Sequence, residues 1–438
     1  MVVNSKLVAE LYDRGLIAQM TGDNSLESHL AEKSRTVYCG FDPTADSLHI
    51  GSLVPLLTLR RFQIAGHKPV ALVGGATGLI GDPSFKSQER QLNTPDIVSD
   101  WTDKIKAQVS QFIDFDAGDI AAEVVNNIDW IAPINMLDFL RDVGKYFSVN
   151  SMIHKESVKQ RINREGAGIS YTEFSYMLLQ SLDFAELYKR NSCTLQVGGS
   201  DQWGNITAGI DLTRRLHGGH VFGLTLPVVT KTNGTKFGKT EEGTIWLDPS
   251  RTSPYAFYQF WLNSADADVY RFLHYFTFLD LAEIEAIQEA DKAANGKPQA
   301  QGILAEEVTR LVHGDQGLQA AKRITEALFR GAIDHLSYTD LTQLQQDGLP
   351  CSKLADVDLR NEPLTSLLVS VGLAKNGKQV KDALMHNAVF INDISVNWDA
   401  NMDSVNIFSS EKALHGQFFV VKLGKKSYHL FIVHGMNK

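Results

Sequence analysis

The sequence predicts an α/β protein: a Rossmann-like parallel-sheet domain, then an all-α domain and a small α+β domain. In the first half of the chain, short β-branched or apolar runs alternate with longer amphipathic segments, as strands and crossover helices do. From residue 253 the apolar residues follow a helical period without clear strands, and beyond residue 363 short helical and strand-like runs alternate. A chain of 438 residues has room for two or three domains, each with its own core.

The expected elements of the first domain include five buried strands. They lie at 36–38, 69–73, 123–127, 194–197 and 225–229. Several of these runs end in a polar or glycine-rich turn that leads into a helix. In open parallel sheets, ligands bind at such turns, at the carboxyl edge. We therefore expect a binding site built from several turns.

The expected domain boundaries follow the changes in sequence pattern. The domains cover residues 1–252, 253–340 and 363–438, with a linker at 341–362. The linker is polar and is broken by Gly348 and Pro350. The last domain should contain helices at 364–371 and 378–386 and strands near 389–391, 418–423 and 428–433.

Composition and charge exclude several classes of protein. The three cysteines form no Cys-x-x-Cys pair, which favours a reducing cytoplasm. The sequence shows no signal-peptide pattern at its start and no run of about 18 apolar residues, so we expect no membrane span. A net charge of -9 argues against a general nucleic-acid coat protein. Residues 363–438 differ, since they carry eight lysines and five acidic residues.

The first turn follows the strand at 36–38 and reads Tyr-Cys-Gly-Phe-Asp-Pro-Thr-Ala-Asp-Ser-Leu-His-Ile-Gly. Backbone amides at the helix start that follows would attract phosphate, and Thr44 and His49 would add directed donors. Asp42, Thr44 and Asp46 are equally suited to be turn and cap residues. The residues alone leave both interpretations open.

The second turn is rich in glycine, but its glycines match neither Gly-x-Gly-x-x-Gly nor a phosphate loop. Its useful feature is Asp82, a carboxylate that could pair with a ligand ammonium group or simply form a turn before Pro83.

The predicted helix at 171–187 places Tyr176, Gln180 and Asp183 on one face. Such a polar stripe either meets water or lines a pocket for a small polar molecule such as an amino acid.

Two further segments carry polar groups. In Gly-Gly-Ser-Asp-Gln-Trp-Gly-Asn, Asp201 could accept hydrogen bonds from ribose hydroxyls. In Lys236-Phe-Gly-Lys-Thr240, two lysines in a glycine loop suit a polyphosphate transition state, or form a solvated basic loop.

Taken together, these segments resemble the class I aminoacyl-tRNA synthetases, and most closely the bacterial enzymes specific for tyrosine. The first turn matches their HIGH region, and Lys-Phe-Gly-Lys-Thr is similar to their KMSKS loop. Tyr-Thr-Glu-Phe-Ser-Tyr-Met-Leu-Leu-Gln and Gly-Gly-Ser-Asp-Gln-Trp-Gly-Asn-Ile agree as well, in the same order. The resemblance covers nearly the whole chain.

The resemblance implies a role for each matching residue. Tyrosine would be bound by Tyr38, Asp82, Tyr176, Gln180, Asp183 and Gln202, with Tyr38 and Asp183 at the phenolic hydroxyl. ATP would be bound by Cys39, Gly40, Asp42, Gly51, Ser52, Gly198, Asp201 and Lys239. The triphosphate would be stabilised during catalysis by Thr44, His49, Lys236, Lys239, Thr240, Lys86 and Arg90.

The implied reaction joins L-tyrosine to ATP, releases pyrophosphate and transfers tyrosine to the 3' end of tRNA(Tyr). Mg²⁺ would accompany the nucleotide, and no protein metal site or editing domain is expected. The resemblance also implies a homodimer, and an RNA-binding surface on the last domain. That surface would contain Lys375, Lys378, Lys381, Lys422, Lys425 and Lys426.

One departure from the family pattern is that HIGH reads His-Ile-Gly-Ser here, with Ser52 in place of the second histidine. Serine can donate a hydrogen bond but is shorter and uncharged, so adenylate formation could be slower. A catalytically impaired relative that only binds RNA is therefore the alternative. The related enzyme for tryptophan is a further alternative, but Tyr38 and Asp183 suit a phenol better.

Overall fold

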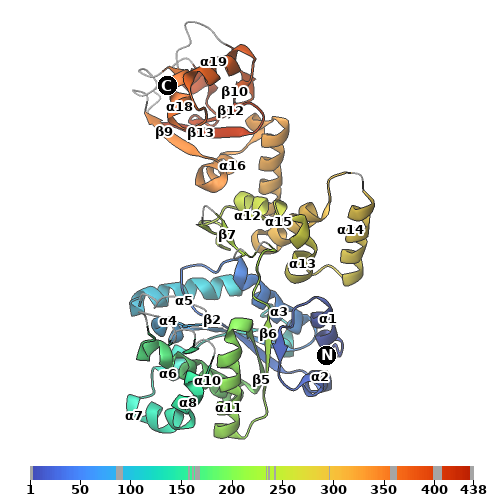
Figure 1. The fold of residues 1–438 in the computed structure, drawn as a ribbon, viewed down its shortest axis with the longest axis vertical. Helices are drawn as coiled ribbons and strands as arrows, with labels where there is room; N and C mark the ends of the chain where they lie inside the picture. The colour runs from blue at the N-terminus through green and yellow to red at the C-terminus, as the bar shows by residue number, and fades with distance from the viewer. Residues whose placement is uncertain are drawn as a thin grey trace. The chain divides into compact units, whose positions relative to one another are not determined.

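The computed structural model describes two compact units, Met1–Asp248 with Ala265–Ala300, and Pro249–Ser264 with Gln301–Lys438 (Figure 1). Residues 3–84, 92–155, 158–159, 162, 168–232, 234, 237–240, 243–294, 296–355, 363–397 and 407–434 are described. In this part of the chain, no helix combines the length and apolarity that crossing a lipid bilayer would require.

The first unit is built on a six-stranded sheet with the order β1-β6-β5-β2-β3-β4. Its strands are β1 (Gln19–Met20), β2 (Thr36–Phe41), β3 (Lys68–Val73), β4 (Glu123–Asn126), β5 (Cys193–Gly199) and β6 (Phe222–Leu226). Neighbours pair in parallel, except for the antiparallel pair of β1 and β6. The predicted parallel sheet is thus confirmed. The run expected at 225–229 lies three residues earlier, because Pro227 cannot donate a ladder hydrogen bond.

Four helices cover this sheet: α3 (Leu53–Ile64), α5 (Pro95–Val109), α10 (Tyr171–Asn191) and α11 (Trp203–His217). Since β–α–β crossovers are right-handed, the strand order puts α3 and α5 on one face and α10 and α11 on the other. The last two pack against each other along their length (Figure 1). The other helices are α1 (Leu7–Asp13), α2 (Asp23–Glu32), α4 (Thr77–Ile80), α6 (Ile128–Ile131), α7 (Met136–Asp138), α8 (Val149–Ile153), α13 (Asp266–Phe276) and α14 (Leu281–Ala293).

Helices α13 and α14 belong to the first unit, although the sequence pattern groups them with the following helices. Two buried arginines explain this. Arg61 of α3 donates a 2.5 Å hydrogen bond to the carbonyl of Thr277, and Arg14 donates a 2.8 Å bond to the carbonyl of Leu279. Burial lowers the pKa of Arg61 to about 9, with the charge of Arg14 adding to the effect. Long-range side-chain contacts of this kind leave no periodic signal in the sequence.

The second unit contains a five-stranded sheet with the order β11-β10-β12-β13-β9. Its strands are β9 (Cys351–Ala355), β10 (Val389–Ile391), β11 (Ile394–Ser395), β12 (Phe418–Leu423) and β13 (Ser427–His434). Its helices are α12 (Pro254–Leu262), α15 (Ala300–Arg330), α16 (Tyr338–Gln343), α18 (Leu364–Ser370) and α19 (Gly377–Met385). The strand β9 lies inside the segment expected to be a linker, where it pairs in parallel with β13.

Both faces of this sheet are covered, because alternate residues of β12 and β13 point to opposite sides. Phe419 and Phe431 pack with Leu367 of α18 and Leu384 of α19. On the other face, the apolar cluster contains Phe418, Val420, Leu430, Ile432, Tyr255, Ile324 and Leu341. The C-terminal sheet therefore shares a core with α12, α15 and α16. This shared core differs from the expectation of an autonomous domain beyond a linker.

The ion pair of Arg323 with Asp340 offers a test of packing within the second unit. Arg323 donates two hydrogen bonds, of 2.9 and 2.8 Å, to a carboxylate that is 1% exposed. We expect Arg323→Ala to lower the free energy of unfolding by about 2–4 kcal/mol at pH 7, since it leaves a buried charge without its partner. Urea unfolding of the full chain followed by circular dichroism measures this.

The matched control is Arg330→Ala on the same helix. Its partner Glu326 is exposed, so this change should cost less than about 0.5 kcal/mol. Equal effects of the two substitutions would contradict the structural role of the Arg323 pair.

Candidate active site

The carboxyl ends of β2, β3 and β5 bring three of the predicted turns together. The chain runs from β2 to β3 in one direction, then crosses back to β5 and continues to β6 in the other. A crevice forms outside the strand ends at such a reversal, here between β2 and β5. The segments 42–52, 74–84 and 199–205 follow these strands directly. The three turns expected to form one site therefore lie at the same edge of the sheet.

The inner end of the crevice carries Tyr38 and Asp183. Tyr38 is 1% exposed on β2, and its hydroxyl lacks a hydrogen-bond partner among the described residues. Its ring contacts Phe184 edge-on, so it points to the face covered by α10. Burial raises the pKa of Tyr38 well above its usual value, and the nearby Asp183 raises it further. A buried hydroxyl without a partner is unfavourable, and a ligand hydroxyl would satisfy it.

Asp183 is held from two sides by donors. The indole Nε1 of Trp130 donates to Oδ1 at 2.8 Å, and the amide Nδ2 of Asn127 donates to Oδ2 at 3.1 Å. Burial raises the pKa of this carboxyl to about 8, although the two donated hydrogen bonds oppose the shift. The carboxyl is thus fixed in orientation and is available to a polar ligand group.

A chain of hydrogen bonds connects Asn127 with the first turn. Asn127 donates to Thr77 at 3.0 Å, and Thr77 donates to Oδ1 of Asp42 at 2.7 Å. Tyr176 donates to Oδ2 of Asp42 at 2.6 Å. Asp42 therefore anchors two elements from inside the site, in addition to its expected place near ATP. The predicted polar stripe of α10 does line the site, through Tyr176 and Asp183.

Four residues of the site were missed from the sequence: Thr77, Asn127, Trp130 and Gln196. Gln196 lies directly beside Tyr38 in the sheet, and its buried Oε1 lacks a partner among the described residues. A polar residue inside an otherwise apolar strand was the available signal for Gln196. Asn127 ends a predicted strand, which gives a weaker signal of the same kind.

The glycines of the second turn allow close approach of side chains rather than phosphate binding. A Cβ atom on Gly74 would lie 2.0 Å from Oδ1 of Asp42, and one on Gly75 would lie 2.3 Å from Oδ1 of Asn126. The amide of Gly75 donates to this same Asn126 oxygen at 3.1 Å. These positions accept only glycine without a shift of the polar network.

A second polar group surrounds Asp82. Gln202 donates from Nε2 to Asp82 at 2.6 Å and to Asp201 at 3.0 Å. Asn205 donates to Oε1 of Gln180 at 2.9 Å and to Oε1 of Gln202 at 3.2 Å. The residues expected at the α-amino and carboxyl groups of an amino acid are thus brought together, whereas the hydroxyl of Tyr176 is directed at Asp42.

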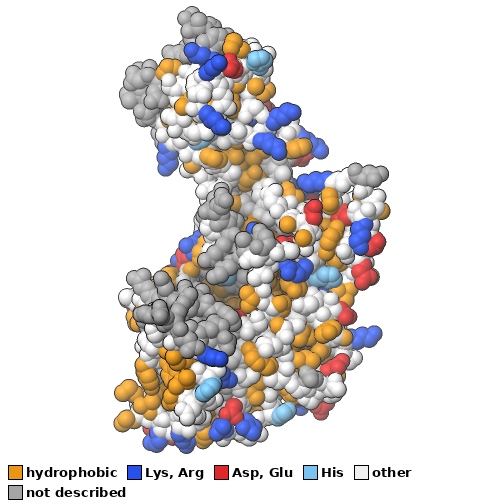
Figure 2. Space-filling model, viewed as in Figure 1, with side chains coloured by type: hydrophobic (Ala, Val, Ile, Leu, Met, Phe, Trp, Pro, Cys, Tyr) orange, Lys and Arg blue, Asp and Glu red, His pale blue; other side chains and the backbone are white. Residues whose placement is uncertain are grey.

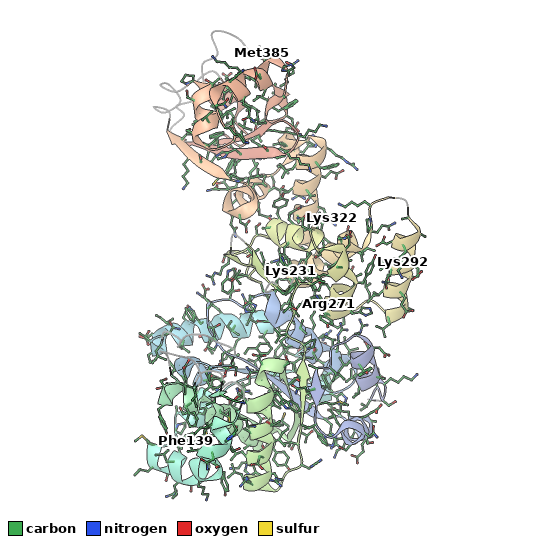
Figure 3. All side chains as sticks on the ribbon, in the orientation of Figure 1. Phe139, Lys231, Arg271, Lys292, Lys322 and Met385 are labelled. Atoms are coloured by element: carbon green, nitrogen blue, oxygen red, sulfur yellow. The ribbon has the colours of Figure 1, made fainter. Side chains whose placement is uncertain are left out.

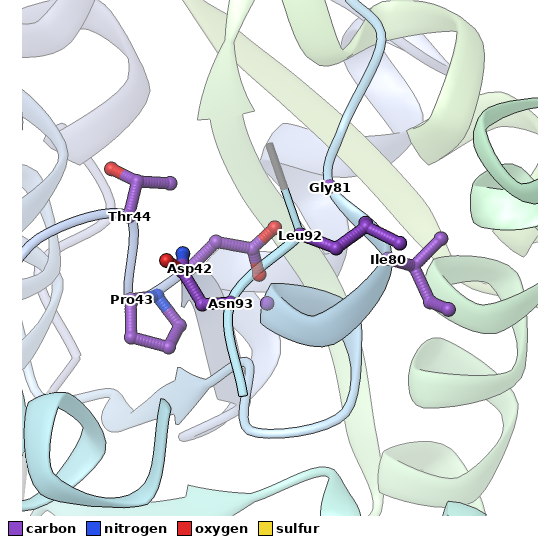
Figure 4. A pocket seen from close by; sticks show the side chains of 8 residues that line it. Asp42, Pro43, Thr44, Ile80, Gly81, Leu92 and Asn93 are labelled. Carbon is purple, nitrogen blue, oxygen red and sulfur yellow. The ribbon is translucent and has the colours of Figure 1, made fainter. Parts of the chain in front are cut away.

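The first turn presents an open, polar surface. A cavity of about 170 Å³ is lined by Asp42, Pro43, Thr44, Gly78, Ile80, Gly81, Leu92 and Asn93 (Figure 4). In the close view, Asp42 lies between Pro43 and Thr44 on one side and Ile80 and Gly81 on the other (Figure 4). Thr44 is exposed.

His49 is exposed, and its Nδ1 accepts a 3.0 Å hydrogen bond from the amide of Gly51. A Cβ on Gly51 would lie 2.7 Å from the His49 ring, so glycine is needed for this geometry. The side chain of Ser52 does not cap α3.

The segment 230–244 contains Lys236 and Lys239 and is called the lysine loop below. Its described part at Lys239 lies beside His49. The strand β7 (Lys239–Thr240) pairs with β8 (Gly243–Thr244), and the amide of Ile245 donates to the carbonyl of Gly238. The amide of Ile50 then donates to the carbonyl of Ile245. The backbone of Lys239 is therefore held close to the first turn. Lys236, Lys86 and Arg90 lie outside the described residues, as do the side chains of Lys239 and Thr240.

Three expected ATP contacts are small or buried. Burial raises the pKa of the Cys39 thiol to about 12, with a further contribution from the charge of Asp201. Gly40, the residue before the end of β2, is exposed, and a Cβ on Gly198 would meet Gln202 and Ile206 at 3.3 Å. Within the described ranges, no group of three or more His, Cys, Asp or Glu residues is placed to hold a metal ion.

The expected RNA-binding lysines lie on the second unit, whose visible face carries several Lys and Arg side chains (Figure 2). Lys375, Lys378 and Lys381 are exposed at α19, and Lys425 and Lys426 are exposed in the turn between β12 and β13. Lys422 is half-buried, with its ammonium 5.3 Å from the ring centre of Tyr428.

Comparison with known proteins identifies relatives of the whole chain. Residues 30–330 match the family model of class I tRNA synthetases (W and Y), and residues 340–431 match a tyrosine–tRNA ligase SYY-like C-terminal domain. The chain is 61% identical to the tyrosine–tRNA ligase of Aliivibrio salmonicida, over 99% of this chain and 100% of that protein. It is 56% identical to the Klebsiella pneumoniae tyrosine–tRNA ligase, over 98% of each chain.

Among solved structures, a C-terminally truncated mitochondrial tyrosyl-tRNA synthetase from Aspergillus nidulans aligns with a TM-score of 0.66 and 31% identity. The alignment covers 74% of this chain and 94% of that one.

The raised pKa of Asp183 predicts a pH dependence of stability. Its carboxyl keeps its proton up to about pH 8 in the native state, against an ordinary value of 3.8. Between these values the native state binds more protons than the unfolded state, so stability falls as the pH rises. From pH 6 to 8, the wild type should lose about 1–2.5 kcal/mol more of its unfolding free energy than Asp183→Asn does.

Urea unfolding at both pH values measures this difference in pH dependence, which does not rely on the absolute stability of the variant. Parallel pH profiles of the two proteins would show that Asp183 titrates normally.

Proposed function

The chain belongs to the class I tRNA synthetases of the tryptophan and tyrosine family, and from this premise we propose that it acts as a tyrosine–tRNA ligase. It activates L-tyrosine with ATP to tyrosyl-adenylate and pyrophosphate, and then transfers tyrosine to the 3' end of tRNA(Tyr). The observation that carries this assignment is the buried pair of Tyr38, with its hydroxyl lacking a partner in the described structure, and Asp183. The catalytically impaired alternative is not favoured.

Substrate selection follows from this pair. The phenolic hydroxyl of tyrosine would donate to Asp183 and bond to Tyr38. Phenylalanine would leave both buried groups without a partner. The resulting discrimination reaches about 10⁴–10⁵, a magnitude for which the tyrosine-specific synthetases are themselves the reference case. Tryptophan lacks a hydroxyl at this position, and the match of residues 340–431 also favours tyrosine.

The other end of the amino acid would lie at the second polar group. Asp82 would pair with the ammonium group of tyrosine, with Gln180 and Tyr176 beside it, and Gln202 would lie near the carboxylate. The distance of 2.6 Å between Gln202 and Asp82 supports this, since it puts one donor and one acceptor at the same place. Asp201 would accept from the ribose of ATP, while Cys39, Gly40 and Gly198 shape the floor of the site.

The chemistry needs positioning and charge stabilisation rather than a protein nucleophile. The tyrosine carboxylate attacks the α-phosphorus of ATP in line, and the bond to pyrophosphate breaks. Thr44 and His49 donate to the departing phosphates from the first turn. Lys236, Lys239, Lys86 and Arg90 would place positive charge around the departing pyrophosphate, and Thr240 would add a hydroxyl donor.

Mg²⁺ is proposed to enter with ATP, because phosphate oxygens are the hard ligands that it prefers. It would neutralise charge on the triphosphate. The tRNA ribose hydroxyl then attacks the carbonyl of the adenylate and releases AMP. We place this reaction in the cytoplasm, where the three cysteines would remain reduced.

The second unit is proposed to bind tRNA. Its lysines at α19 and at the turn between β12 and β13 would face phosphates, as basic residues outside an apolar core do. The helices of 253–340 would carry the anticodon-binding function, and residues 1–252 the chemistry. The shared core of the second unit means that removing the C-terminal sheet would expose Ile324 and Leu341. Substitution of lysines is therefore a cleaner test than truncation.

A homodimer is also proposed. Met136, Leu137 and Leu140 are exposed apolar residues close together in sequence, and Val149 and Ile153 of α8 follow. Figure 2 shows apolar side chains gathered over this part of the first unit, where Phe139 is labelled in Figure 3. A monomer rarely exposes a contiguous apolar patch of this kind, so a second copy is its natural partner.

Aminoacylation assays test the assigned substrate. Tyrosine-dependent ATP–pyrophosphate exchange should occur with tyrosine and be lower by at least about 10³ in kcat/KM with phenylalanine or tryptophan. Tyr38→Phe should lower kcat/KM for tyrosine about 10-fold, because one hydrogen bond to the substrate is lost, and should raise kcat/KM for phenylalanine, because one buried group without a partner is removed. Absence of exchange in a folded protein would refute the assignment.

The basic surface is tested by replacing Lys375, Lys378 and Lys381 together with Gln. We expect tRNA charging to weaken, and the slope of log affinity against log salt to decrease by about 2–3, with pyrophosphate exchange unchanged. Lys189→Gln, an exposed lysine of α10, is the control and should change neither. Equal loss of charging and exchange would contradict the division of labour between the units.

A further inference from the structure

Helix α13 carries a set of side chains that contact the chain on the amino-terminal side of Lys239. Asp268, Arg271, Phe272 and Phe276 lie at spacings of three and four residues, so they share one face of the helix. We call them the anchoring face. The proposed mechanism does not use these residues.

The acidic member of this face holds the start of the lysine loop. Asp268 is 2% exposed, and its two oxygens accept from the amide of Thr232 at 3.1 Å each. The hydroxyl of Thr232 also donates to Oδ1 of Asp268, at 2.5 Å. Arg271 donates to the carbonyl of Thr230 at 2.6 Å and to Oδ1 of Asp268 at 2.5 Å. A buried carboxylate, an arginine and two backbone groups thus fix residues 230–232.

The aromatic members hold the loop a few residues further on. The ring of Phe237 stacks on Phe276, with centroids 5.3 Å apart and an interplanar angle of 21°, and lies 4.9 Å from the ring of Phe272. The next residue, Gly238, has a φ of +79° and lies so close to Ile50 that a Cβ would approach Cγ1 to 2.9 Å. Ile50 directly follows His49 in the sequence, so Gly238 lies next to the first turn.

We propose that Asp268 is a positioning residue for phosphate chemistry, which acts by fixing the lysine loop at Thr232 while Phe272 and Phe276 fix it at Phe237. The carboxylate touches neither ATP nor tyrosine in this scheme. It fixes the position of the backbone that leads to Lys239 beside His49. It therefore affects the step in which pyrophosphate leaves. Lys231 and Arg271, labelled in Figure 3, mark this region.

The energetic reason is that two lysines can stabilise a leaving group only if their backbone is ordered before the reaction. Ordering a flexible loop in the transition state would cost conformational entropy for each residue fixed. The anchoring face fixes Thr230, Thr232 and Phe237 through charge-assisted hydrogen bonds and ring contacts instead. Tyrosine binding, which occurs at Tyr38 and Asp183, should be independent of this anchor.

The first experiment compares Asp268→Asn with Asp266→Asn, an exposed acid on the same helix. The rate of tyrosyl-adenylate formation should fall about 10-fold in Asp268→Asn, since it loses a charge-assisted acceptor. The affinity for tyrosine, measured by equilibrium dialysis, should stay within about twofold. Asp266→Asn should behave as the wild type. A comparable loss of tyrosine affinity and rate in Asp268→Asn would overturn the proposal.

The second experiment does not depend on activity. Limited trypsin digestion with mass spectrometry follows cleavage after Lys231 and Lys239, which should become at least about fivefold faster in Asp268→Asn than in the wild type. Unchanged cleavage would show that Asp268 does not hold the loop.

A third pair of variants covers the case in which Asp268→Asn does not fold. Thr232 is exposed, so Thr232→Val should fold while losing the hydroxyl bond, and Thr232→Ser should restore it. We expect faster cleavage and slower adenylate formation in Thr232→Val only. Identical behaviour of the two Thr232 variants would overturn the proposal.

This inference rests on the proposed function for its rate measurement. If the wild type shows no tyrosine-dependent exchange, the proposed function fails, while the digestion comparison still decides whether the anchor exists.

Discussion

A buried carboxylate is the constraint on which the first unit depends. Asp183 lies inside the protein because Trp130 and Asn127 donate to it, and these residues occur just after β4. Burying a carboxyl without donors is costly, so the segment that follows β4 must approach α10 closely. The crevice beside β2 exists because this contact holds both sides of it. Selection of a phenol is thus linked to the packing of the sheet.

The two ends of the site are built on different principles. The proposed tyrosine end is buried, with Tyr38, Asp183 and Gln196 on regular elements. The proposed triphosphate end consists of turns, where Thr44 and His49 are exposed and where Thr232 and Phe237 contact α13. This division suits the reaction, because amino-acid selection requires buried partners, whereas pyrophosphate must enter and leave.

The sequence predicted many elements of this architecture, but fewer of the contacts between residues that are far apart in the chain. The strands β2, β3 and β5, the helix α10 and the turns that follow the strands are visible as local patterns, since period and turn chemistry act over a few residues. The strand β9 was missed inside an expected linker, because it is a strand only by pairing with β13. Likewise, α13 joined the first unit through Arg61, a contact between residues far apart in sequence.

The sequence by itself determined the fold class, the order of the turns and the residue types that can bind an amino acid and a nucleotide. Only the tertiary structure decided that Asp42 anchors Thr77 and Tyr176, that Asn127 and Trp130 orient Asp183, and that Asp268 accepts from Thr232. Local patterns report which face of an element is apolar. They do not report which distant polar group completes a hydrogen bond, because burial and direction arise only when the chain is folded.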